Sequence, residues 1–139
     1  MPKTFYVGIK GIIVNGNKVL ILKCKDKTKD NFYWDLPGGR MEDGETILQA
    51  LERELSEELP TIENIQIKNL ITAYKLPHAL PDGQGLMLLM YKVLAYLPAI
   101  TLSNEHSEYK WVSKDELPFI EKDACISAEY KEILFRAFE

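Results

Sequence analysis

The sequence contains only two cysteines and two histidines, and neither pair is spaced as metal ligands are. Cys24 and Cys125 lie far apart in the chain, so they form no zinc half-site, and we expect both to be reduced thiols. His78 and His106 are also distant from each other, and we expect each to be a surface or hydrogen-bonded side chain. The sequence therefore predicts no zinc site and no disulfide framework.

The sequence also has no excess of positive charge and no long apolar run. The formal net charge of −4 provides no overall field that would hold DNA, so a phosphate-bearing substrate would need a local cation such as a divalent metal ion. The longest apolar run, residues 86–97, is interrupted by Lys92 and is too short to span a bilayer, and the N-terminus lacks the apolar core of a signal peptide. We expect a cytoplasmic protein, monomeric or homodimeric, with no DNA or membrane partner.

The length of 139 residues is enough for one domain, residues 1–139. Predicted strands and helices alternate along it. Strand-forming residues predict strands at 5–14, 19–22, 33–36, 65–74, 86–97 and 109–112, the first two joined by a hairpin turn at 15–17. Helical spacing predicts helices at 46–59 and 127–138, and polar composition predicts loops at 23–31 and 77–85. Residues 37–39 read as a turn. This order predicts an α/β fold, a mixed sheet with a helix on each face.

The helix predicted at 46–59 has an apolar stripe and clear end signals. Leu48, Leu51 and Leu55 follow helical spacing, so we expect them to dock the helix on the sheet. Thr46 is placed to cap the first turn, and Pro60 disfavours helical backbone at the residue before it.

Three carboxylates share one side of this helix, because Glu54, Glu57 and Glu58 are spaced i, i+3 and i+4. Carboxylates at this density repel one another unless a cation lies among them, and hard oxygen ligands suit Mg²⁺, with Mn²⁺ as a substitute. Arg53 lies four residues before Glu57 and two turns after Glu45, where it can hold carboxylates by bidentate hydrogen bonds.

The segment 39–61 resembles the Nudix box. Seven of its nine specified positions match, at Gly39, Glu45, Arg53, Glu54, Leu55, Glu57 and Glu58, and residues 34–38 resemble the lead-in common in that family. Pro60 and Thr61 depart from the glycine and the aliphatic residue of the box, which puts the loop after the helix in question but not the carboxylates. The resemblance implies the α/β/α sandwich of that family, with a mixed sheet between helices, and hydrolysis of nucleoside diphosphate derivatives with Mg²⁺.

The resemblance also implies roles for single residues. Glu57 and Glu58 would be the main metal ligands, Glu54 a further ligand directly or through water, and the Gly39 carbonyl another. Glu45, Arg53 and Gly38 would shape the helix and the loop before it, with Arg53 also counted in the catalytic set beside Glu54 and Glu57. An additional carboxylate, as ligand or base, is expected in the segment 104–111. A Glu-His pair there favours Glu105 over Glu108.

The substrate is less constrained. Tyr33, Trp34 and Tyr74 can stack on a base or belong to the core, Arg40 is a candidate substrate contact, and Lys23, Lys25, Lys27 and Lys29 are either a solvated loop or phosphate contacts. The Glu105-His106 resemblance favours a nucleoside triphosphate or dinucleoside polyphosphate. The position of Pro77 resembles ADP-ribose-cleaving members, which keeps ADP-ribose as an alternative. A non-catalytic nucleotide-sensing module on the same fold is the other alternative.

Overall fold

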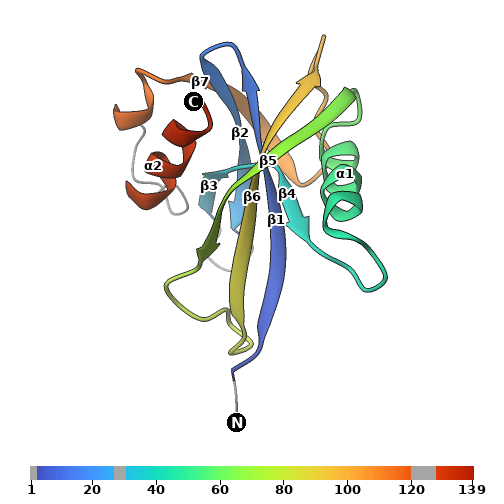
Figure 1. Cartoon of the computed structure of the whole chain (residues 1–139), viewed down its shortest axis with the longest axis vertical. Coiled ribbons are helices and arrows are strands. Elements are labelled where there is room, and N and C mark those ends of the chain that lie inside the picture. Colours follow the sequence, from blue (N-terminus) through green and yellow to red (C-terminus); the bar gives the residue numbers. More distant parts are fainter. Residues whose placement is uncertain (1–2, 27–30, 120–127) are drawn as a thin grey trace.

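The structure is a computed structural model that describes residues 3–26, 31–119 and 128–139 (Figure 1). Its elements, in chain order, are β1 (Phe5–Asn15), β2 (Lys18–Asp26), β3 (Asn31–Asp35), β4 (Gly38–Arg40), α1 (Ile47–Glu58), β5 (Glu63–Lys75), β6 (Gly85–Tyr96), β7 (His106–Ser113), the 3₁₀ turn η1 (Leu117–Phe119) and α2 (Ala128–Arg136). No helix in the described part of the chain is long and apolar enough to cross a membrane.

The described strands form a mixed sheet of seven, in which the order β3-β2-β1-β6-β5 is extended by β4 beside β1 and β7 beside β2. β1 and β6 run parallel, and the other pairs are antiparallel. β1 pairs with β2 only at its end next to the turn, at Val14 and Asn15. Earlier in the strand, at residues 8–10, β1 pairs with β4 instead. The sheet therefore forks between β1 and β2, and residues 36–40 enter the fork.

Each helix covers its own hydrophobic core, and the two helices lie on opposite sides of the sheet (Figure 1). Ile9, Ile13 and Val93 belong to the core under α1, whereas Ile12 and Met90 belong to the core under α2. This alternation along β1 follows from the period of two in a strand whose faces are both buried. The predicted α/β class with a helix on each face is confirmed.

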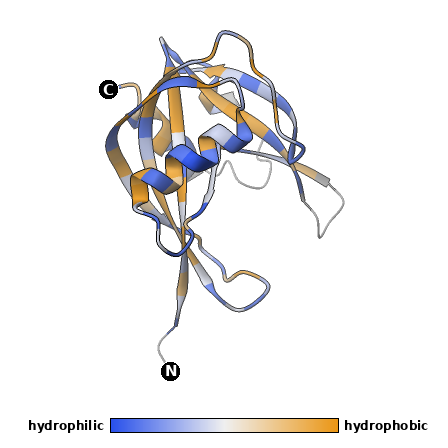
Figure 2. Ribbon diagram, turned by 90° about the vertical axis from the view of Figure 1, so that its right-hand side faces the viewer, coloured by the Kyte–Doolittle hydropathy of each residue, from blue (hydrophilic) through white to orange (hydrophobic). Residues whose placement is uncertain are grey.

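Helix α1 begins and ends where the sequence predicts. Thr46 and Gln49 form a reciprocal capping box, and Leu59 is the C-cap in front of Pro60. The chain then turns without the glycine of the box, because the Ile62 N–H donates to the Leu59 carbonyl and Ile62 packs on the core. Figure 2 shows the hydrophilic outer side of α1 in front of strands rich in hydrophobic residues.

The prediction that Leu48 docks the helix on the sheet is wrong. Leu51 and Leu55 are completely buried, but Leu48 is 50% exposed. Leu48 points to the same side of the helix but belongs to its first turn. Helical spacing gives the direction of a side chain and says nothing of how much of the helix the sheet covers.

Two other segments differ from the sequence prediction. Residues 23–26 continue β2 instead of forming a loop, because β3 and β7 pair with them on both sides and outweigh their polar composition. Gly38–Arg40 forms the short strand β4 rather than a turn only, since β1 offers it an unpaired edge inside the fork. Lys27, Lys29, Cys125 and the first residue of the predicted second helix, Ser127, lie outside the described residues.

The contrast between Leu55 and Leu48 predicts unequal costs for the same substitution in one helix. Leu55→Ala should lower the free energy of unfolding by about 2–5 kcal/mol, because it leaves a cavity in the core under α1. Leu48→Ala should change it by no more than about 0.5 kcal/mol. Urea unfolding followed by circular dichroism measures both, and equal losses would contradict this description of the core.

Candidate active site

Glu58, in the last turn of α1, points into the fork of the sheet. Its side chain is almost completely buried, with 5% exposed, and its Oε2 accepts a hydrogen bond of 2.9 Å from the Gly38 N–H. Gly38 has φ of +143°, and a Cβ there would lie 2.1 Å from the Ile9 carbonyl oxygen. Glycine is therefore needed at the position whose N–H holds the buried carboxylate.

Glu54 lies one turn before Glu58, against the backbone of Gly39. A Cβ on Gly39 would be 2.5 Å from Glu54 Cδ, so the absence of a side chain at this position lets the carboxylate approach. The glycine pair of β4 thus positions two glutamates of α1, one by a hydrogen bond and one by close contact. The structure places the Gly39 backbone beside Glu54, and the predicted role of its carbonyl as a metal ligand stays a prediction.

Arg53 is the centre of the hydrogen bonds on the outer side of this cluster. Its Nε and Nη2 donate to the two carboxylate oxygens of Glu45, at 2.5 and 3.0 Å, which is the bidentate contact that their spacing predicts. Its Nη1 donates to Glu54 at 3.0 Å and to Glu57 at 3.3 Å, and its Nη2 also donates to the Arg40 carbonyl. The hydrogen bond from Arg53 holds the pKa of Glu45 below its ordinary value.

A second group of ligand atoms comes from the start of β7. Oxygens of Glu58 and Glu105 and a ring nitrogen of His106 all lie within 4.8 Å of one another. Beside them, Glu57, Glu58 and Glu105 line a small cavity of about 240 Å³ together with Ser103 and Asn104. Glu108, the other candidate for the additional carboxylate, instead forms an ion pair with Lys23 at 3.2 Å.

For His106 the sequence predicted a surface or hydrogen-bonded side chain, and the structure places it beside the carboxylate cluster. It is half-buried, and its Nδ1 has no hydrogen-bond partner among the described residues. Burial lowers its pKa below the ordinary value, and a neutral imidazole is the form that binds metals. Sequence spacing could not reveal this cluster, because Glu58 comes from a helix almost fifty residues before Glu105 and His106.

The carboxylates raise one another's proton affinity. Burial raises the pKa of Glu58 to about 8, the neighbouring Glu54 and Glu105 add to this, and Lys10 and the Gly38 N–H oppose it. Burial also raises the pKa of Glu54. A buried carboxylate (Glu58) close to the partly buried Glu54 and the exposed Glu105, with an unpartnered nitrogen beside them, fits a divalent cation, whose charge offsets their repulsion.

A larger cavity of about 400 Å³ adjoins this cluster on the side of the sheet that α2 covers. Gly39 and Lys10 belong to both places, since Gly39 lines the cavity and touches Glu54, and Lys10 lines it and faces Glu58. The remaining lining residues are mostly aromatic or aliphatic: Tyr33, Tyr74, Tyr130, Leu76, Pro77, Leu80, Leu86 and Leu88, with Gly8, Asp35, Arg40 and His78.

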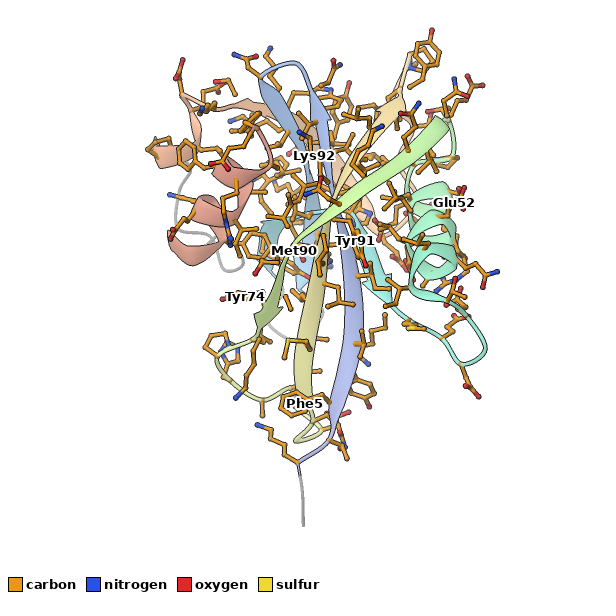
Figure 3. All side chains as sticks on the ribbon, in the orientation of Figure 1. Phe5, Glu52, Tyr74, Met90, Tyr91 and Lys92 are labelled. Atoms are coloured by element: carbon orange, nitrogen blue, oxygen red, sulfur yellow. The ribbon has the colours of Figure 1, made fainter. Side chains whose placement is uncertain are left out.

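Some of the predicted substrate-contact residues line this cavity and others do not. Tyr33, Tyr74 and Arg40 line it, and Figure 3 shows Tyr74 extending from β5 toward the side where α2 lies. Tyr74 meets Tyr130 edge to face, with ring centroids 5.8 Å apart. Trp34 does not line the cavity and packs instead on the core under α2. Lys23 lies over the rings of Phe32 and Trp34 rather than in the cavity.

Comparison with known proteins agrees with this architecture. The NUDIX domain model matches residues 5–134. An ADP-ribose pyrophosphatase of Methanocaldococcus jannaschii is 38% identical over 77 residues, 55% of this chain and 44% of the relative, so the match spans less than half of that protein. An 8-oxo-dGTP diphosphatase of Buchnera aphidicola is 28% identical over 78% of each chain. The crystal structure of a MutT protein from Methanosarcina mazei superimposes with a TM-score of 0.79 at 20% identity, covering 99% of this chain and 95% of that one.

The family match covers almost the whole chain, and the fold and the carboxylate helix are those that its motif implies. The chain therefore belongs to the Nudix family.

Two glycines with positive φ, Gly38 just before the box and Gly44 inside it, predict different costs for substitution by alanine. Gly38→Ala should lower the free energy of unfolding by at least about 3 kcal/mol, because the new Cβ collides with the backbone of β1 and displaces the N–H that holds Glu58. Gly44→Ala meets no atom within 4 Å and should cost only the backbone strain, about 1–2 kcal/mol. Chemical denaturation compares them, and a Gly38→Ala protein as stable as Gly44→Ala would contradict the packing described.

Proposed function

We propose that this chain hydrolyses a phosphoanhydride bond in a nucleoside triphosphate or dinucleoside polyphosphate, with a divalent cation held by its carboxylate cluster. One observation supports this above the others. A cavity with an aromatic lining, large enough for one nucleoside, adjoins a cluster of carboxylates and shares Gly39 and Lys10 with it. The family match spans residues 5–134, so we also propose that residues 1–139 act as one catalytic domain.

Glu58 and Glu105 would hold the cation, with Glu54, Glu57 and the Gly39 carbonyl as further oxygen donors. Oxygen donors of this kind favour Mg²⁺, and the imidazole of His106 would also accept Mn²⁺. When bound, the cation offsets phosphate charge and lowers the pKa of a bound water, which supplies a nucleophile near neutral pH.

The residues around the cluster have separate tasks in this proposal. Arg53 fixes the carboxylates of Glu45, Glu54 and Glu57 relative to one another. Glu57 is 60% exposed and lines the small cavity opposite Glu105, so both can meet a substrate phosphate or accept a proton from the attacking water. The tyrosines of the larger cavity would stack on the base.

ADP-ribose is the second candidate substrate. Pro77, the residue whose position suggested it, lines the larger cavity, and one relative carries the name ADP-ribose pyrophosphatase. The other relative is named for a nucleoside triphosphate, and its alignment covers 78% of both chains. The preference for a triphosphate or dinucleoside polyphosphate rests on this wider alignment and on Glu105-His106 at the cluster.

A nucleotide panel tests the activity and the cluster together. With Mg²⁺ and a coupled phosphatase or pyrophosphatase, phosphate release is measured for dNTPs, oxidised dGTP, diadenosine tetraphosphate, ADP-ribose and NADH. Glu57→Gln should lower kcat on the best substrate about a thousandfold with little loss of stability, because it removes a carboxylate that would bind the cation or accept the proton of the attacking water. The matched control is Glu52→Gln, whose side chain points away from the sheet on the same helix (Figure 3) and should stay within about twofold. Full activity of Glu57→Gln would contradict the mechanism.

Metal removal gives an independent measurement. EDTA should abolish turnover and Mg²⁺ should restore it, and calorimetric titration should show Mn²⁺ binding to the wild-type protein. Glu58→Gln should weaken that binding about tenfold to a hundredfold, because it replaces a charged donor in the cluster by a neutral amide. Glu52→Gln again serves as control, and unchanged Mn²⁺ affinity in Glu58→Gln would place the cation elsewhere.

A further inference from the structure

Tyr6, near the start of β1, is joined to the loop that closes one side of the larger cavity. This pocket loop (residues 76–84) contributes Leu76, Pro77, His78 and Leu80 to the cavity lining. The Tyr6 hydroxyl donates a hydrogen bond of 2.7 Å to Asp82 Oδ2 at the tip of the loop. Asp82 Oδ1 accepts from the Gln84 N–H at 3.0 Å, so both oxygens of the carboxylate are engaged.

The start of β1 and the end of the pocket loop also meet along the backbone. The Gly85 N–H donates to the Thr4 carbonyl at 3.0 Å, and the Thr4 hydroxyl donates to the Gln84 side chain. These contacts hold the base of the loop. Among the described residues, Tyr6–Asp82 is the side-chain contact that reaches from β1 to the loop's tip.

The ring of Tyr6 supports a second group, the guanidinium of Arg40, whose central carbon lies 4.1 Å from the ring centroid. Arg40 is the last residue of β4, and its carbonyl accepts a hydrogen bond from Arg53, so its backbone is tied to the carboxylate helix. Its side chain lines the larger cavity. Within the described ranges its guanidinium makes no hydrogen bond or ion pair, although Asp82 is close enough to interact electrostatically.

A stacked guanidinium with unused donors is suited to a phosphate group. Arginine binds phosphate through two parallel N–H donors, and stacking on an aromatic ring fixes its plane in advance and so reduces the entropy lost on binding. Tyr6 thus acts on two sides of the cavity, since its hydroxyl holds the loop and its ring face holds Arg40.

We propose that Tyr6 and Asp82 are positioning residues for substrate binding: their hydrogen bond holds the pocket loop against the nucleoside, and the Tyr6 ring presents Arg40 to the phosphate chain. The inference rests on the proposed function, because it takes the larger cavity as the nucleoside site. It adds a specific consequence, which is that two residues outside the Nudix box set KM without touching the reacting atoms.

A double-mutant cycle tests the hydrogen bond. KM and kcat are measured on the best substrate of the panel for Tyr6→Phe, Asp82→Ala and the double variant. Each single change should raise KM about fivefold and leave kcat within about twofold, and the double variant should be no worse than either single one. Asp82→Asn keeps an acceptor and should recover part of the affinity. Tyr96→Phe, an exposed tyrosine at the opposite end of β6, is the matched control.

A second comparison separates the ring from the hydroxyl. Tyr6→Leu removes both, so it should raise KM several-fold beyond Tyr6→Phe, and this extra effect should disappear in an Arg40→Gln background. If the extra effect persists without Arg40, the ring has a structural role only and the presentation of Arg40 is wrong.

Thermal unfolding of every variant distinguishes a loss of stability from a loss of substrate affinity. A lower Tm with unchanged KM would overturn the inference, as would fully additive effects in the cycle. If wild-type protein turns over none of the panel, the proposed function fails, and the cycle is then read as the Kd of the non-hydrolysable α,β-methylene analogue of ATP by calorimetry. An unchanged Kd in the variants, or no binding by the wild type, overturns the inference in that case.

Discussion

The partly buried ion pair between Lys10 and Asp35 is the interaction on which the rest of the site depends. The Lys10 ammonium lies 3.1 Å from Asp35 Oδ2, both side chains are about 14% exposed, and it also donates to the Leu36 carbonyl. Burial alone would lower the pKa of Lys10, but Asp35 and Glu58 together raise it above the ordinary value, so the cation keeps its charge in the fork. Without it, Asp35 and Glu58 would face each other in a poorly solvated space, at a cost that buried carboxylates seldom tolerate.

The same pair connects the larger cavity with the carboxylate cluster. Asp35 Oδ1 accepts a hydrogen bond of 2.7 Å from the Tyr130 hydroxyl on α2, and Tyr130 packs edge to face on Tyr74. The wall of the larger cavity and the charge balance of the carboxylate cluster are therefore fixed by one chain of contacts, from α2 through Asp35 and Lys10 to Glu58. A change at α2 can reach the carboxylates by this route although the helix contains none of the Nudix box.

What the sequence could predict was local. Helical spacing placed Glu54, Glu57 and Glu58 on one side of α1, and the two-turn separation of Glu45 and Arg53 gave their bidentate contact. The fork and its contents could not be predicted in this way. Lys10 reads as a polar interruption in an apolar strand, and its partners lie 25 residues away at Asp35 and, through Asp35, at Tyr130, 95 residues beyond that. Leu48 was misjudged, and the position of His106 beside Glu58 was not predicted, because spacing carries no information about which elements pack around a residue.

The distribution of cations bears on how a chain with net charge −4 would bind the polyphosphate substrate that we propose. Lys10 is engaged by Asp35 and Glu58, and Arg53 by Glu45, Glu54 and Glu57, so both serve to hold carboxylates in place. In the described part of the chain, Arg40 is the cation at the larger cavity that keeps its donors unused, and stacking on Tyr6 holds it there. In the proposed function, attraction for the phosphates would come from Arg40 and from a divalent cation bound by the carboxylates. Affinity for an anionic substrate would then have two sources, an arginine that the chain carries and a metal ion that it binds.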